Sequence, residues 1–186
     1  TYALVVTGPH PGRPAVGLQP VGLLVLMAQC RLHIPAASGS ELSVFPKIFA
    51  DIGDGQSIEQ SLSTFSAHIT NTIRILRQVD TQSLVILDEL GSGTDPNFGG
   101  GIAQAVLEQL VTKKVWGLAT THYYNLKVFA SNFPGMRNAA MLFDNDHLLP
   151  LFRLEIGQPG SSFALELARQ TVMSTEPNST SEPPLA

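Results

Sequence analysis

At 186 residues, the chain has the length of one domain with a full core. With 44% hydrophobic and 14% charged residues, it is too apolar to be a disordered chain. Eleven Lys and Arg residues against fifteen Asp and Glu residues leave a net charge of −4, which lacks the basic footprint of nucleic-acid binders.

The single cysteine, Cys30, excludes a disulfide framework within the chain and suits the reducing cytoplasm. Because Cys30 follows an apolar run, we expect it to be buried. The longest such run, residues 21–28, is shorter than the roughly 20 residues that cross a bilayer, so no membrane partner is expected. The N-terminus enters a strand-like segment directly, without a charged leader, which predicts a piece of a longer protein.

The first half of the chain begins with strand and helix patterns in alternation. Residues 2–7 form a short β-rich run, and a Gly/Pro-rich stretch follows at residues 8–14. The apolar segment 16–29 predicts a helix, in which Pro20 should introduce a kink or delay the start. Residues 45–52 predict a second strand.

An amphipathic helix is predicted over residues 61–79. Its apolar residues recur at three- and four-residue steps and should form one buried face: Leu62, Phe65, Ile69, Ile73 and Leu76. The continuous apolar run at residues 83–87 then has the length of a strand covered on both faces.

The same alternation continues to the end of the apolar part of the chain. The remaining predicted elements are a helix marked by Ile102, Val106 and Leu110, strands at 115–119, 139–143 and 149–156, and a helix at 161–169. This order predicts one α/β domain over residues 1–173, with a mostly parallel sheet and helices on both faces. The polar, Pro-rich residues 174–186 predict a disordered tail.

Two acids, Asp88 and Glu89, end the apolar strand at residues 83–87. In a parallel sheet this position is the carboxyl edge, where α/β folds bind ligands. In P-loop enzymes such a pair supplies one acid that orients Mg²⁺ and one that polarises the attacking water. Taken alone, the pair fits a strand that ends in solvated acids equally well.

Two nearby features favour the functional interpretation. A Gly-rich turn follows at residues 91–96, where Thr94 or Asp95 is placed to cap the next helix. One strand later, His122 follows the apolar residues 115–119. A lone histidine is usually a surface or core residue, but adjacent parallel strands would bring this one near the acidic pair, where it could sense a γ-phosphate.

Together with Leu62-Ser63-Thr64-Phe65-Ser66, these segments resemble the ATPase domain of the MutS family. They look most like its second bacterial branch, which is associated with recombination control and ribosome rescue rather than classical mismatch repair. The matching stretches are residues 21–29, 48–54, 56–59, 62–66, 87–96, 121–123 and 157–164. The resemblance implies a P-loop NTPase fold of the ATP-binding-cassette type, with ATP and Mg²⁺ as cofactors.

The resemblance implies a role for each matching residue of the acidic edge. Asp88 would bind Mg²⁺ as the Walker B acid, and Glu89 would be the general base. His122 would be the switch histidine. Gln29 would fall near the Q-loop.

The resemblance also implies a homodimer formed through the ATPase domains. Ser63 and Thr64 would belong to a signature loop that contacts the γ-phosphate held by the partner subunit. Thr94 and Asp95 would lie in a loop that crosses the dimer interface. DNA, or the ribosome, would be bound by regions outside this chain.

The phosphate-binding loop departs from the family pattern, which reads approximately T-G-P-N-x-G-G-K-S. The corresponding nucleotide-binding residues are Thr7, Gly8, Pro9, His10, Pro11, Gly12, Arg13, Pro14, Ala15 and Val16. Pro14 stands where the lysine for the β- and γ-phosphate oxygens belongs, and Ala15 stands where the metal-binding hydroxyl belongs. Arg13 replaces a glycine and is the only cation nearby in the sequence.

The sequence therefore predicts an ATPase by family whose ATP binding and hydrolysis are impaired. Removing one such group typically costs roughly 10²–10³-fold in rate, and here two are lost. The alternative is a non-catalytic dimerisation domain that lends its signature loop to a competent partner. A transporter-type cassette is disfavoured because residues 62–66 lack the Gly-rich signature. The departures cluster at residues 10–20, which leaves evolved loss, deliberate alteration and a sequence error all open.

Overall fold

The computed structural model describes residues 2–7, 14–52, 61–144, 147 and 149–160, with the side chains of residues 14–19, 61–64, 143 and 150 outside that description. The phosphate-loop residues 8–13 and the expected helix and tail after residue 160 also lie outside it. Within the described part, the elements follow in the order β1 (Ala3–Thr7), α1 (Pro14–Gln29), β2 (Lys47–Asp51), α2 (Ser61–Gln78), β3 (Ser83–Leu87), α3 (Pro96–Thr112), β4 (Trp116–Thr120), α4 (Tyr124–Asn132), β5 (Met136–Asp144) and β6 (Leu149–Ile156).

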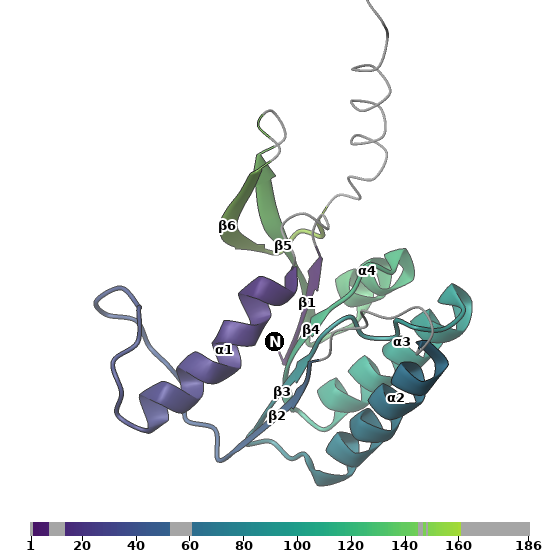
Figure 1. Ribbon diagram of the computed structural model, residues 1–186, viewed down its shortest axis with the longest axis horizontal. Coiled ribbons are helices and arrows are strands. Elements are labelled where there is room, and N and C mark those ends of the chain that lie inside the picture. Colours follow the sequence, from purple (N-terminus) through teal and green to yellow (C-terminus); the bar gives the residue numbers. More distant parts are fainter. Residues whose placement is uncertain (1, 8–13, 53–60, 145–146, 148, 161–186) are drawn as a thin grey trace, which may run out of the picture.

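The strands form one mixed, mostly parallel sheet in the order β2-β3-β4-β1-β5-β6. All neighbouring pairs are parallel except β5 and β6, which are antiparallel. Helix α1 covers one face of the sheet, and α2, α3 and α4 cover the other (Figure 1). This arrangement confirms the expected α/β fold.

Alternate residues of β3 supply both cores, because successive side chains of a strand point to opposite faces. Val85 and Leu87 belong to the cluster that packs against α2, α3 and α4. Leu84 and Ile86 belong to the cluster under α1. All five residues of this strand are buried, as the continuous apolar run predicts.

Helix α1 approaches the sheet closely at Gly22, where an added Cβ would lie 2.7 Å from the Ile86 Cδ1 atom. The helix begins at Pro14, so Pro20 lies inside it and does not delay its start. Cys30, which follows the last helical residue, is exposed, and the expectation of a buried thiol was therefore wrong. The cysteine lies in the turn that directly follows the helix end at Gln29.

Helix α2 turns most of its predicted apolar face toward the domain, with Phe65 and Ile69 half-buried and Leu76 packed against the core, but Ile73 points outward. Ile73 is 45% exposed, whereas Thr72 and Ile75 are buried. Thr72 and Ile75 are three positions apart and share one helical face. The expectation that Ile73 is buried was wrong because the contact with the sheet, rather than apolar spacing alone, fixes how the helix is rotated.

Helix α4 was not predicted from the sequence. It has nine residues, and its first residue follows Tyr123, whose side chain makes no capping hydrogen bond. The segment therefore lacks both the length and the polar start signal by which helices are usually found in a sequence.

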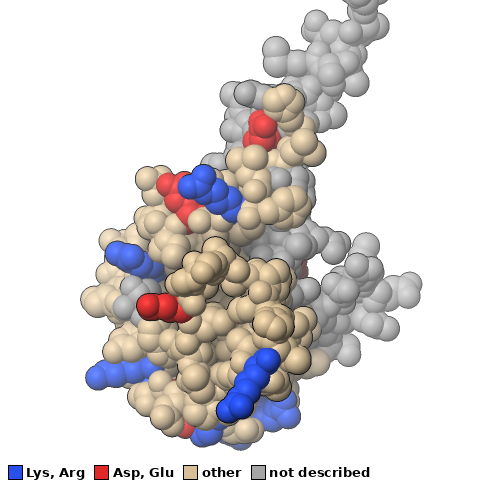
Figure 2. All heavy atoms as spheres, turned by 90° about the vertical axis from the view of Figure 1, so that its left-hand side faces the viewer, with Lys and Arg blue, Asp and Glu red and all other residues tan. Residues whose placement is uncertain are grey.

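On the face that carries α1, the described residues form no concentrated patch of positive charge. The Lys and Arg side chains of this face are scattered, with Asp and Glu side chains among them (Figure 2). Such a face offers no strong positive field to a phosphate backbone. Across the described ranges, no helix is both long and apolar enough to cross a membrane.

Candidate functional site

Four neighbouring parallel strands reach one edge of the sheet, each with a polar residue at its end. β2 ends at Asp51, β3 is followed by Asp88, β4 ends at Thr120 and β1 ends at Thr7. The pairing of β2 with β3, β3 with β4 and β4 with β1 keeps these ends level. The carboxyl ends of parallel strands are where open α/β sheets bind ligands, which makes this edge the candidate site.

Thr120 connects the two acids of the site. Its buried hydroxyl donates a hydrogen bond of 2.6 Å to the Asp88 carboxylate and accepts the Glu89 backbone N–H at 2.7 Å. The Asp88 N–H is itself held by the Asp51 carbonyl at 2.9 Å. Both the main chain and the carboxylate of Asp88 are therefore fixed by neighbouring strands, which suits a metal-binding acid.

The chain turns sharply at Glu89, directly after the fixed acid. Glu89 has a φ of 47°, a left-handed conformation that is uncommon for residues other than glycine. Two hydrogen bonds hold this turn, one from its N–H to Thr120 and one from the Ser92 N–H to its carbonyl. The Glu89 side chain is exposed at the edge. Unfavourable backbone held in place by its surroundings is typical of functional sites.

The loop after Glu89 packs tightly against the start of α3. An added Cβ on Gly99 would lie 2.2 Å from the Gly91 carbonyl oxygen, so the two backbones touch. The Tyr123 hydroxyl donates a hydrogen bond of 2.9 Å to the same carbonyl. Burial, with the Asp95 charge as a second cause, raises the pKa of Tyr123, so its hydroxyl keeps its proton as a donor. This packing fixes the path of the loop.

Asp95 caps helix α3. Its carboxylate accepts hydrogen bonds from the N–H groups of Asn97 and Phe98, at 3.0 and 3.3 Å. The sequence left Thr94 and Asp95 open as the cap, and the structure selects Asp95. The expectation that this loop crosses a dimer interface stays a prediction.

His122 follows β4 at the same edge and is exposed. Its ring lies 4.5 Å from the ring of Tyr123, centroid to centroid. Because β4 lies between β3 and β1, His122 emerges between the strand of the acidic pair and the strand that leads to the phosphate loop. This position agrees with a residue that senses a nucleotide, and the sensing itself stays a prediction.

The residues at the start of α1 and at the acidic edge show how well this chain could bind a nucleotide together with Mg²⁺. The helix begins at Pro14, after β1 ends at the edge, so its N-terminus is suited to an anion. The described residues hold no cluster of three or more His, Cys, Asp or Glu side chains. One acid, such as Asp88, together with phosphate and water oxygens is what Mg²⁺ prefers at nucleotide sites. The edge therefore fits, but Pro14 and Ala15 supply neither the cation nor the hydroxyl of a complete phosphate loop.

Gln29 lies away from this edge. Helix α1 has 16 residues, so its last residue is about 24 Å along the axis from its first. The Gln29 side chain bonds to the backbone of Phe45 in both directions, at 2.7 and 3.2 Å. The expectation of a Q-loop position is therefore corrected: Gln29 holds the segment that leads into β2.

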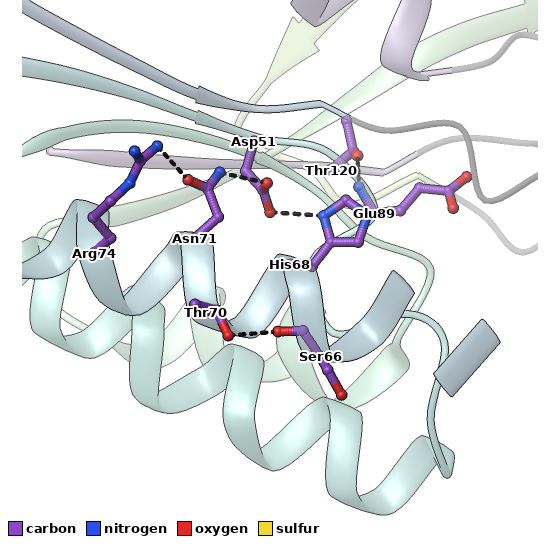
Figure 3. A network of polar contacts seen from close by, with 8 residues as sticks. All are labelled: Asp51, Ser66, His68, Thr70, Asn71, Arg74, Glu89 and Thr120. Carbon is purple, nitrogen blue, oxygen red and sulfur yellow. Dashed lines mark hydrogen bonds and ion pairs between the residues drawn. The ribbon is translucent and has the colours of Figure 1, made fainter. Parts of the chain in front are cut away.

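A polar network joins α2 to the end of β2 (Figure 3). The Asp51 carboxylate contacts His68 Nδ1 at 2.9 Å and accepts a hydrogen bond from Asn71 Nδ2 at 2.7 Å. Arg74 donates to the Asn71 carbonyl oxygen at 2.8 Å. Ser63 and Thr64, the expected signature residues, lie in the first turn of the same helix, and their side chains fall outside the description.

Sequence reasoning missed three residues of this edge: Thr120, Asp51 and His68. Thr120 could have been noticed because a threonine that ends a buried strand must satisfy its hydroxyl. For Asp51 and His68 there was no local signal, since their contact depends on how α2 returns across β2.

Comparisons with known proteins agree with this geometry. Residues 4–180 match the family model described as MutS domain V. The chain is 56% identical over 167 residues to Endonuclease MutS2 of Thermomicrobium roseum. Proteins with the same name from Lachnoclostridium phytofermentans and Geobacillus thermodenitrificans are each 52% identical, over 171 and 167 residues. These alignments cover 90% to 92% of this chain but 21% to 22% of the relatives, so the chain spans about a fifth of their length.

Proposed function

Because this chain belongs to the MutS family, in its second branch, we propose that it is the ATPase domain of a longer protein that acts on DNA. The observation that carries this proposal is the fixed position of Asp88, Thr120 and Glu89 at the carboxyl edge of the sheet. Bound Mg-ATP would supply the γ-phosphate that is transferred to water.

Each residue of the edge has a defined task in this proposal. Asp88 holds Mg²⁺ through a carboxylate that Thr120 keeps in one orientation. Glu89 accepts a proton from the attacking water. His122 donates a hydrogen bond toward the γ-phosphate. Charge-assisted contacts of this kind strengthen as charge moves in the reaction.

The phosphate loop limits the rate in this proposal. Pro14 offers no charge to the β- and γ-phosphates, and Ala15 offers no hydroxyl to Mg²⁺. Arg13 carries a charge, but it replaces a glycine of the family pattern, at a position where the backbone normally approaches the nucleotide. We therefore propose weak ATP binding and slow hydrolysis, even though the acidic edge is complete.

A second candidate function is supported by the difference between the signature segment and the phosphate loop. The segment that contains Ser63 and Thr64 keeps the family sequence and begins a regular helix, while the phosphate loop has lost two of its groups. In a dimer with a partner subunit whose phosphate loop is intact, such a subunit would complete the partner's site without hydrolysing ATP itself. This is the non-catalytic alternative, in which the domain supplies dimerisation and a signature loop.

Restoring the phosphate loop tests whether its altered residues limit hydrolysis. A variant with Arg13→Gly, Pro14→Lys and Ala15→Ser should hydrolyse ATP at least about 10²-fold faster than the unchanged chain. Adding Asp88→Asn to the restored variant should abolish the gain, which controls for contaminating ATPases. Equal rates for the unchanged and restored chains would sink the proposal of a degraded loop.

Mixing tests the non-catalytic alternative. The unchanged chain is added to a restored chain that carries Ser63→Ala, so that each has one defect. Recovery of hydrolysis would support a lent signature loop. Recovery that persists when the unchanged chain also carries Ser63→Ala would argue against it.

The partners of the full-length protein are a separate proposal. The relatives are named endonucleases, and this chain matches about a fifth of their length. We propose a cytoplasmic protein in which regions outside this chain bind DNA or the ribosome, and in which ATP controls that binding through a dimer of these domains. Measuring ATP hydrolysis by the full-length protein with duplex DNA, branched DNA or ribosomes would identify the partner that changes the rate.

A further inference from the structure

Helix α2 is attached to the domain in two different ways along its length. Its second half is held by apolar packing, with Thr72 and Ile75 at 3% and 2% exposure and Leu76 packed against the core. In its first half, His68 is half-buried and bonds to a charged group of β2 rather than to the apolar core. Phe65 and Ile69 in this half are only half-buried and do not join the core cluster, so the His68 contact adds a polar attachment to the end of the helix that carries the signature sequence.

These polar contacts converge on the Asp51 carboxylate. His68 Nδ1 lies 2.9 Å from Asp51 Oδ2, with the side chains 26% and 13% exposed. Asn71 Nδ2 donates to Oδ1 at 2.7 Å. Because Arg74 donates to the Asn71 carbonyl oxygen, the amide of Asn71 is oriented with its N–H groups toward Asp51. Both carboxylate oxygens are thus used from successive turns of one helix (Figure 3).

The same aspartate also contacts the acidic edge. The Asp51 carbonyl accepts the Asp88 N–H at 2.9 Å. One residue therefore bonds to α2 through its side chain and to the metal-binding segment through its main chain.

We propose that His68 is a positioning residue that sets where the signature end of α2 stands relative to the acidic edge. Through Asp51, it holds the first turn of α2, with Ser63 and Thr64, at a fixed place for contact with the nucleotide on the partner subunit. This role rests on the proposed ATPase dimer. In this role His68 does not contact the nucleotide. A substitution of His68 should therefore affect the nucleotide site of the partner subunit, which the α2 helix carrying His68 completes.

If His68 acts through its hydrogen bond to Asp51, loss of its N–H donor should have a larger effect than a change in the shape of its side chain. His68→Gln keeps an N–H donor on a flexible side chain, whereas His68→Leu keeps bulk and removes the donor. The His147 Nδ1 contact with Asp144 Oδ2, at 2.8 Å, is a matched histidine–aspartate pair beside the β5–β6 turn. His147→Leu therefore serves as the control.

The first test measures amide hydrogen exchange on the whole chain, which reports local opening of α2. Losing a charge-assisted hydrogen bond should speed exchange of residues 66–71 by about tenfold or more in His68→Leu. His68→Gln should stay close to the unchanged chain, and His147→Leu should leave these amides unaffected. Unchanged protection in His68→Leu, or equal loss in the Leu and Gln variants, would overturn the proposal.

The second test uses mixed dimers in which one subunit has the restored phosphate loop and the other keeps the original one. Placing His68→Leu in the subunit with the original loop should lower kcat by about tenfold. Placing it in the restored subunit should have little effect, as should His147→Leu in either. An equal loss from both placements would overturn the proposal. If the dimer with His147→Leu hydrolyses no ATP, the ATPase dimer fails and the shared-site role with it, while hydrogen exchange still decides whether His68 holds α2.

Discussion

Thr120 and Asp88 are joined across neighbouring strands by a hydrogen bond of 2.6 Å from hydroxyl to carboxylate. The same hydroxyl accepts the Glu89 N–H at 2.7 Å, so one buried atom serves both acids of the site. A threonine oxygen can act as donor and acceptor at once, which neither valine nor alanine can do. The geometry of the acidic pair therefore depends on a residue from another strand.

Replacing this hydroxyl should destabilise the fold at the edge of the sheet. Thr120→Val keeps the shape of the side chain but leaves the Glu89 N–H without its acceptor. We expect the free energy of unfolding to fall by about 1–3 kcal/mol, measured by urea denaturation. Thr120→Ser, which keeps the hydroxyl, is the control. Equal stability of the Val and Ser variants would contradict a structural role for the hydrogen bond.

The sequence predicts those parts of this edge that depend on a single local segment of the chain. The run at residues 83–87 predicts a buried strand, and the acids after it must then lie at the carboxyl edge. By contrast, Thr120 reaches Asp88 because β4 pairs with β3 in one particular register. Such a register is fixed by the whole sheet and not by the residues beside Thr120.

The contact between α2 and β2 could not be predicted either, because it also depends on the tertiary structure. His68 and Asp51 are 17 residues apart, and their contact depends on the path of the chain between them. The rotation of α2 likewise buries Ile75 and exposes Ile73, although both are apolar isoleucines in one helix. The spacing of apolar residues indicates roughly which side of a helix is buried, and tertiary packing determines the exact rotation of the helix.

Gly99 should tolerate no side chain. A Cβ there would lie 2.2 Å from the Gly91 carbonyl oxygen and 2.8 Å from the Tyr123 hydroxyl. Since backbone cannot move aside cheaply, Gly99→Ala should lower the free energy of unfolding by about 1–3 kcal/mol or more. The hydrogen bond from Tyr123 to Gly91 would be disturbed as well, and thermal or urea denaturation measures the sum.

Gly101 gives a matched control in the same helix, because a Cβ there meets nothing within 4 Å. Gly101→Ala should raise stability by about 0.5–1 kcal/mol, since alanine favours helix more than glycine does. If the two alanine variants changed stability alike, the close approach of Gly91 and Gly99 would not be the cause.

Lys127 should make stability depend on pH. It is 7% exposed, its Nζ donates to the Gly160 carbonyl at 2.8 Å, and burial lowers its pKa below the usual 10.5. Between the lowered pKa and 10.5, the unfolded chain binds more protons than the folded one, so stability rises with pH. The free energy of unfolding of the unchanged chain, minus that of Lys127→Met, should therefore increase as pH approaches 10.5. Urea denaturation at several pH values measures this difference, and a constant difference would contradict it.

Glu89 should control hydrolysis without controlling ATP binding. In the restored background, Glu89→Gln keeps the side-chain shape and the backbone hydrogen bond to Thr120 but removes the base. The hydrolysis rate should fall by about 10²–10⁴-fold, while the affinity for ATP, measured by calorimetry, stays close to that of the restored chain. Glu108→Gln, on an exposed position of α3, is the control. A parallel loss of affinity and rate would instead assign Glu89 to nucleotide binding, because a general base acts on the water and not on the ground-state nucleotide.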